Sequence, residues 1–135
     1  ERNIGGVLPL IILTNCGAIT QRLSHPSEKT EKEYVVSLSK PFREEHAQAL
    51  VNGMDIPAGF ARAAAVEKIT KRSIAIVLHQ GLKRQIRHML DCLGYRVTRL
   101  VRVRIGNLTD DSLKPGNWRF LGRRDITSIF NETKH

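Results

Sequence analysis

The residues best suited to bind a charged partner are concentrated between Gly81 and Arg104. This segment holds one acid, Asp91, against seven cations: Lys83, Arg84, Arg87, Arg96, Arg99, Arg102 and Arg104. Alternation along a predicted strand places Arg96, Arg102 and Arg104 on one face. Like charges at that spacing destabilise a strand, so an anionic partner such as nucleic-acid phosphate would explain them. A basic face that meets only solvent is the alternative.

The overall charge favours the same kind of partner. The 135-residue chain has 22 lysines and arginines against 13 acids, and its net charge of +9 attracts polyanions, most often nucleic acid. Cys16 and Cys92 form no metal-ligand spacing with the five histidines, and we expect both to be buried thiols. The length suits one domain, residues 1–135. No apolar run is long enough to span a bilayer, so we expect no membrane partner.

These side chains need a scaffold, and the apolar periodicity predicts an α+β domain whose largely antiparallel or mixed central sheet is flanked by helices. One helix opens at Pro41 and ends near Asn52. The clearest helix follows Gly81, with an apolar stripe at Leu82, Ile86, Met89, Leu90 and Leu93. The predicted strands cover 10–14, 33–38, 61–69, 73–79 and 95–105, the third and fourth forming a hairpin. We expect the first of these strands to be buried on both faces.

Four sequence blocks, in order along nearly the whole chain, resemble the catalytic domain of the RsuA/RluB/RluE/RluF-type ribosomal RNA pseudouridine synthases. The blocks are LTN (13–15) with RL (22–23) and HP (25–26); EKEY (31–34); GLKRQIRHML (81–90) with GY (94–95) and RVRIG (102–106); and LKPGNWR (113–119). The resemblance implies the pseudouridine synthase catalytic-domain fold for this chain.

The resemblance also implies a reaction. Members of the family break the glycosidic bond of uridine, turn the uracil and rejoin it through carbon, without a cofactor or a metal. The target base has to leave any helical stack to be reached. The implied partner is ribosomal RNA, and we expect a monomer that works in the cytoplasm, or in an organelle matrix in a eukaryote.

Individual residues take roles from the same resemblance. Arg87, in the RQIR motif, is expected to orient the catalytic carboxylate by a forked contact, with a phosphate contact as the alternative. Tyr34 is expected to stack on the flipped uracil, with a core position beside Val36 and Leu38 as the alternative. The remaining candidate residues are expected to contact RNA: Lys32, Lys83, Arg84, Arg96, Arg102 and Arg104.

The chain departs from the family at the position of the catalytic aspartate. One alignment matches Arg2, Asn3 and Gly6 to the family's DRNTxG form. It places Glu1 at the aspartate, whereas an ungapped alignment places Ile4 there. We take Glu1 as the candidate carboxylate and expect the chain as given to form little pseudouridine, because one extra methylene displaces the reacting group.

Two further expectations concern the extent and the activity of the chain. The N-terminal RNA-binding domain that many members carry, and the first strands of their catalytic domain, are expected to be absent. A catalytically inactive RNA-binding protein that keeps the synthase fold is the alternative to an active enzyme.

Overall fold

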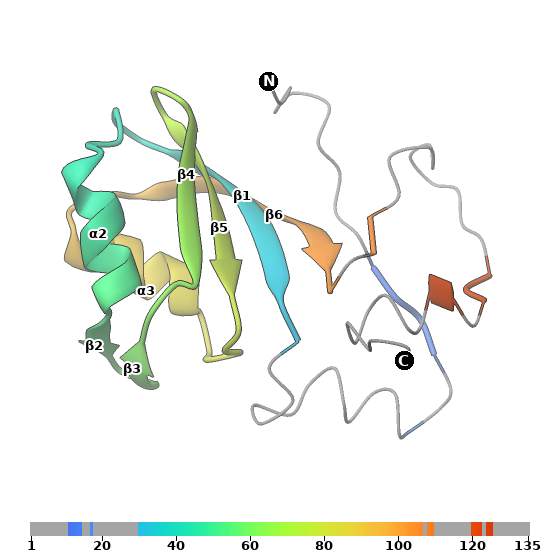
Figure 1. Ribbon diagram of the computed structural model, residues 1–135. Coiled ribbons are helices and arrows are strands. Elements are labelled where there is room, and N and C mark those ends of the chain that lie inside the picture. The colour runs from blue at the N-terminus through green and yellow to red at the C-terminus, as the bar shows by residue number, and fades with distance from the viewer. Residues whose placement is uncertain are drawn as a thin grey trace.

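The computed structural model describes residues 11–14, 17, 30–106, 108–109, 120–122 and 124–125, and its centre is a four-stranded antiparallel sheet (Figure 1). The strand order is β4-β5-β1-β6, and a separate two-stranded ribbon pairs β2 with β3. The elements are β1 (Lys32–Leu38), α2 (Glu45–Asn52), β2 (Met54–Ile56), β3 (Gly59–Ala61), β4 (Ala65–Thr70), β5 (Ser73–Leu78), α3 (Gln85–Cys92) and β6 (Val97–Ile105). The α+β fold predicted from the sequence is confirmed.

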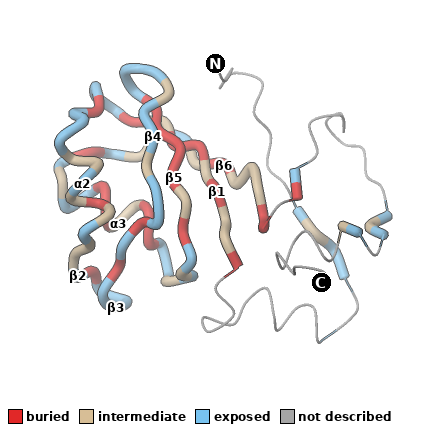
Figure 2. Tube along the Cα trace, in the orientation of Figure 1, coloured by how far each residue is buried: buried red, intermediate tan, exposed pale blue. Residues whose placement is uncertain are grey.

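Both helices cover the same face of the sheet, and the main core lies between them and that face (Figure 1). Val36 of β1 and Ile76 of β5 are fully buried there, and α3 contributes Met89 and Leu90. Figure 2 shows buried positions along most of β5 and in β1. In β1, Val36 and Leu38 are buried on the helix-covered face, and Glu33 and Val35 are buried on the opposite face. Tyr34 lies on this covered face and packs against the core from its partly buried position.

The predicted hairpin is present as β4 and β5, joined through residues 71–72. The predicted strand 61–69 starts later in the structure, since β4 begins at Ala65. Ala61 instead ends β3, whose pairing with β2 the sequence did not predict. The helix before β2 ends as predicted, with Gly53 at a φ of 98°, a backbone conformation that favours glycine. A Cβ at Gly53 would lie 2.6 Å from Cζ of Phe60, so this position also has no room for a side chain.

Three predictions about the scaffold are wrong. Helix α2 begins at Glu45 rather than Pro41, because tertiary contacts hold the residues before it: the Phe42 N–H donates to the Lys71 carbonyl (2.7 Å). Residues 11–14 are irregular rather than a buried strand, and Leu13 is 90% exposed. No described strand pairs with this segment to give it strand hydrogen bonds. Cys92 is an exposed free thiol, since it lies on the helix side away from the core.

Strand β6 contains a register shift that reverses the predicted orientation of one arginine. Arg104 pairs with Glu33 of β1, and Arg102 pairs with the next residue, Tyr34, so Val103 is an extra residue in the ladder. Such a bulge interrupts the simple alternation of side chains. Arg102 therefore shares the helix-covered face with Tyr34, whereas Arg104 lies on the opposite face with Glu33. The prediction that Arg102 and Arg104 share one face is wrong.

Candidate functional site

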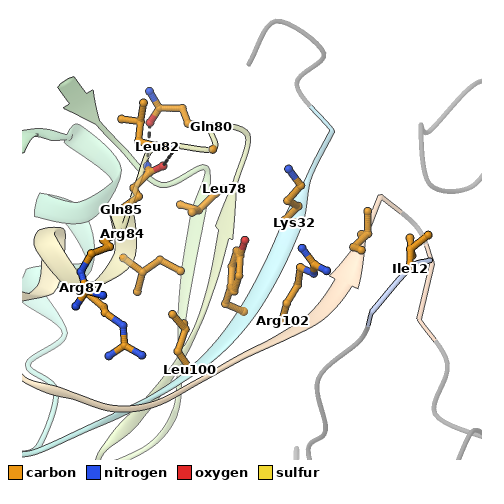
Figure 3. A pocket seen from close by; sticks show the side chains of 14 residues that line it. Ile12, Lys32, Leu78, Gln80, Leu82, Arg84, Gln85, Arg87, Leu100 and Arg102 are labelled. Carbon is orange, nitrogen blue, oxygen red and sulfur yellow. Dashed lines mark hydrogen bonds between the residues drawn. The ribbon is translucent and has the colours of Figure 1, made fainter. Parts of the chain in front are cut away.

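A pocket of about 470 Å³ opens beside the helix-covered face of β1 and β6, next to the loop that leads into α3 (Figure 3). Its apolar part is made by Leu78, Ile86, Leu100 and Ile105. The volume falls within the range of about 300–1,000 Å³ that is usual for small-molecule and cofactor sites. The site therefore has room for one nucleotide-sized group.

Four cations line this pocket, and none of its described lining residues is an acid. Arg84 and Arg87 approach from the start of α3, while Lys32 and Arg102 stand opposite them on neighbouring strands (Figure 3). Burial lowers the pKa of Lys32 below its ordinary value, and the charge of Arg102 lowers it further. Charges crowded to this extent are stabilised by a bound anion, so the lining is suited to phosphate.

Tyr34 adds an aromatic surface to the charged lining. Its ring packs against the core and also lines the pocket, so its core position leaves the ring open to a bound group, and its stacking on uracil stays a prediction. Burial raises the pKa of Tyr34, although the nearby Arg102 acts against this rise by charge and hydrogen bond. The phenol therefore keeps its proton at neutral pH and can donate a hydrogen bond.

Arg84 adopts a backbone conformation that is rare for a residue with a side chain. Its φ of 51° and ψ of 35° lie in the left-handed region, immediately before the first residue of α3. This conformation costs roughly 1–2 kcal/mol in a residue other than glycine. Backbone strain of this kind persists only where surrounding contacts impose it, and it is frequent at functional sites.

Gln85 and Gln80 supply such contacts, and the sequence analysis did not single them out. Gln85 is 3% exposed; its Oε1 accepts from the Leu82 N–H (3.3 Å) and its Nε2 donates to Oε1 of Gln80 (2.9 Å), as Figure 3 shows. One signal was available in the sequence. Gln85 is four residues before Met89, within the apolar stripe of the helix, where a polar residue has to be hydrogen-bonded.

Arg104, predicted to contact RNA, is instead the centre of an ion-pair network on the other face of the sheet. Its Nε donates to Oε1 of Glu33 (3.0 Å) and its Nη2 to Oε1 of Glu31 (3.1 Å), and a third bond reaches the Gly106 carbonyl. Burial disfavours its charge, but the bonds to the two glutamates outweigh burial and raise its pKa. His79 donates to Oε2 of Glu31 (2.9 Å); this bond is the largest single cause that lowers the pKa of Glu31, and Arg104 lowers it further. Arg104 therefore joins β6 to β1, and its charge is already neutralised within the protein.

The structure separates the other candidate residues. Arg87 and Tyr34 line one pocket, as predicted, together with Lys32, Arg84 and Arg102. Lys83 and Arg96 are exposed and do not line it; the Arg96 carbonyl accepts from the Ser39 N–H at the far end of β1. Glu1 lies outside the described residues, so the pairing of Arg87 with a carboxylate at that position stays a prediction.

Within the part of the chain that the structure describes, no helix has the length and apolar character needed to cross a membrane. No group of three or more histidine, cysteine or acidic side chains in that part is arranged to hold a metal ion.

Comparison with known proteins gives a consistent result. The model of a family described as RNA pseudouridylate synthase matches residues 10–91. The dual-specificity RNA pseudouridine synthase RluF of Salmonella typhi is 35% identical over 121 residues, which cover 90% of this chain and 42% of that protein. Ribosomal small subunit pseudouridine synthase A of Vibrio cholerae is 31% identical over 124 residues, 90% of this chain and 54% of that protein.

A solved structure agrees with these sequence relationships. The crystal structure of a pseudouridylate synthase superposes with a TM-score of 0.78 at 27% sequence identity, over 86% of this chain and 52% of that chain. The chain spans about half the length of the proteins that it matches.

Proposed function

Because this chain belongs to the RNA pseudouridylate synthase family, we propose that it isomerises uridine to pseudouridine in ribosomal RNA. The observation that carries the proposal is the pocket, which four cations and an aromatic ring line together and whose described lining residues include no acid. This combination suits a single nucleotide turned out of its helix, since an aromatic ring can stack on the base while cations hold the adjacent phosphates.

The proposed substrate pose assigns the cations to the RNA backbone. Lys32, Arg84 and Arg102 contact the phosphates beside the target uridine, and Lys83 and Arg96 contact more distant ones. The low pKa of Lys32 supports this assignment, because a phosphate next to it would offset both its burial and the repulsion from Arg102. Arg104 contributes by holding β1 and β6 together rather than by touching RNA.

The chemistry requires a carboxylate, an orienting cation and a place for the base. The bond between N1 of uracil and C1′ of ribose breaks, a bond from C5 to C1′ forms, C5 loses its proton and N1 gains one. A carboxylate assists by covalent or acid–base catalysis, and we assign it to the position of Glu1. Arg87 orients that carboxylate by charge-assisted hydrogen bonds, while Tyr34 stacks on the uracil with its hydroxyl near the C5 proton.

A modification assay with three forms of the chain tests this function. Each form is incubated with a ribosomal RNA transcript, and pseudouridine is mapped by carbodiimide-blocked primer extension. We expect slow modification by the unaltered chain and a rise of roughly 100-fold in Glu1→Asp, because the shorter side chain restores the position of the carboxylate. Asp55→Ala is the matched control and leaves the rate unchanged, since Asp55 is exposed on β2 and outside the pocket lining.

Two results would contradict the assignment in different ways. Rapid modification by the unaltered chain that survives Glu1→Ala would remove Glu1 from the mechanism and leave the function standing. RNA binding without pseudouridine in any variant would favour the catalytically inactive RNA-binding alternative.

A further inference from the structure

The side-chain nitrogen of Gln85 has both of its hydrogens engaged by contacts within the protein. Besides its bond to Oε1 of Gln80, its Nε2 donates to the Arg62 carbonyl (3.4 Å) and lies 3.7 Å from Sδ of Met89. Its Oε1 accepts from the Leu82 N–H. An amide nitrogen carries two hydrogens, so none remains for a ligand. Gln85 lies in the pocket wall without a donor to offer RNA.

Gln80 extends this arrangement to the β2–β3 ribbon. Its Oε1 accepts from the Arg62 N–H (2.9 Å) as well as from Gln85, and its Nε2 donates to the Phe60 carbonyl (2.9 Å). The backbone N–H groups of Arg62 and Leu82 bond to the side-chain oxygens of Gln80 and Gln85, and an N–H group can only donate. They fix the orientation of both amides, so the two glutamines form one directed relay of hydrogen bonds.

The relay holds the loop that carries the strained Arg84. Leu82 and Gln85 are joined twice, since the Gln85 N–H donates to the Leu82 carbonyl (3.1 Å) and the Leu82 N–H donates to the Gln85 side chain. These two bonds close a turn ahead of the first residue of α3. The turn contains Arg84 and sets the direction in which α3 starts, and Arg87 lies in the first turn of that helix.

We propose that Gln85 and Gln80 are positioning residues. They hold the side of the pocket that carries Arg84 and Arg87 in the orientation that binds RNA. The inference rests on the proposed function and deepens it. Neither glutamine contacts the reacting atoms; each acts through the loop at residues 80–84. A side chain held by several hydrogen bonds within the protein keeps the fixed orientation that a binding site needs.

Binding measurements with methionine substitutions test the relay, because methionine keeps the length of glutamine and removes its hydrogen bonds. The dissociation constant is measured for a uridine-containing single-stranded RNA oligonucleotide. We expect about tenfold weaker binding in Gln85→Met and in Gln80→Met, and no further loss when both changes are combined. Gln48→Met is the matched control, because Gln48 is an exposed glutamine on α2 that bonds only to Asn52 among the described residues.

A double-mutant cycle separates positioning from general stability. In an Arg84→Ala background, Gln85→Met should weaken binding by less than threefold, since the side chain that it positions has been removed. A structural effect alone would lower the melting temperature and weaken binding equally in both backgrounds. Gln80 is only half-buried, so Gln80→Met gives the answer if Gln85→Met does not fold.

The binding results separate the positioning role of the glutamines from the proposed function. RNA binding by the unaltered chain that neither glutamine substitution changes would overturn the positioning role and leave the proposed function intact. Absence of RNA binding by the unaltered chain would overturn the proposed function and this inference with it.

Discussion

Tyr34 and Arg102 face each other across β1 and β6, and both side chains line the same pocket. Burial alone would strongly disfavour the phenolate form of Tyr34, and the guanidinium partly offsets this effect. The pair combines an apolar ring and a fixed positive charge at neighbouring points of one wall. A nucleotide bound there would meet a surface for its base and a charge for its phosphate within one strand spacing, about 5 Å.

The ring of Tyr34, rather than its hydroxyl, should determine RNA affinity. We predict that Tyr34→Leu weakens binding of a uridine-containing oligonucleotide by about 1–3 kcal/mol, roughly 5- to 150-fold, because stacking is lost. Tyr34→Phe should bind almost as well as the unaltered chain. Fluorescence anisotropy measures both, and Phe60→Leu is the matched control, since Phe60 is 53% exposed and outside the pocket lining. Equal losses in the leucine and phenylalanine variants would show that stacking is not the basis of binding.

Arg102 and Arg104 should give opposite results although only Val103 separates them. Arg102→Ala should reduce the salt dependence of RNA affinity by about one phosphate contact. Arg104→Ala should leave the salt slope unchanged and lower the free energy of unfolding by about 1.5–3 kcal/mol, because the largely buried Glu33 carboxylate loses its ion pair with Arg104.

Salt titrations and urea unfolding check this pair of variants. Arg43→Ala is the control for both measurements, since Arg43 is exposed and paired with Glu45. A lower salt slope in Arg104→Ala would mean that Arg104 meets RNA despite its internal ion pairs.

Lys32 should make RNA affinity depend on alkaline pH. Its pKa in the folded chain lies below the ordinary lysine value of about 10.4, so it loses its charge at a lower pH than an exposed lysine. A bound phosphate favours the charged form, so affinity should fall as pH rises through the lowered pKa. Lys32→Arg keeps its charge and should remove this fall, whereas the exposed Lys68→Arg should not. Binding of a deoxyuridine oligonucleotide, which resists alkaline cleavage, is the measurement.

Glu31 should stabilise the fold mainly above its unfolded pKa of about 4.3. Its folded pKa is lowered, chiefly by the hydrogen bond from His79, so the stabilisation is complete above that value and disappears as pH falls through the folded pKa. The Glu31 side chain is 41% exposed, and we expect less than about 1 kcal/mol from it. Thermal melting of Glu31→Gln against the unaltered chain should show a difference near pH 6 that shrinks below about pH 4. Glu67→Gln, an exposed change on β4, should show no such trend.

Much of the fold could be predicted from the sequence because its signals are local. The alternation in β1, the hairpin of β4 and β5 and the apolar stripe of α3 each depend on residues within a few positions of one another. The meeting of Arg87 and Tyr34 in one pocket came from the family resemblance, since no local pattern links residues so far apart in the chain.

The features that the sequence did not predict depend on contacts between distant segments. The bulge in β6 exists only relative to β1, and nothing in the residues around Val103 marks the extra position. The β2–β3 ribbon has three residues in each strand, too few for an alternation signal. The pairing of Gln80 with Gln85 requires Arg62 and Phe60 from another part of the chain to complete it.

The bulge at Val103 decides which arginine side chain faces the pocket, so the charge of the site depends on strand register as well as on which residues are present. Replacing Val103 by another side chain would leave Arg102 facing the pocket and Arg104 facing Glu33. Deleting it would remove the bulge and leave a regular ladder in which Arg104 still pairs with Glu33. A regular ladder that kept Val103 would instead pair Val103 with Glu33 and turn Arg104 to the face of Arg102, away from its glutamates. Two relatives with identical basic residues could therefore present different charges to a substrate if one has this bulge and the other pairs the same residues in a regular ladder.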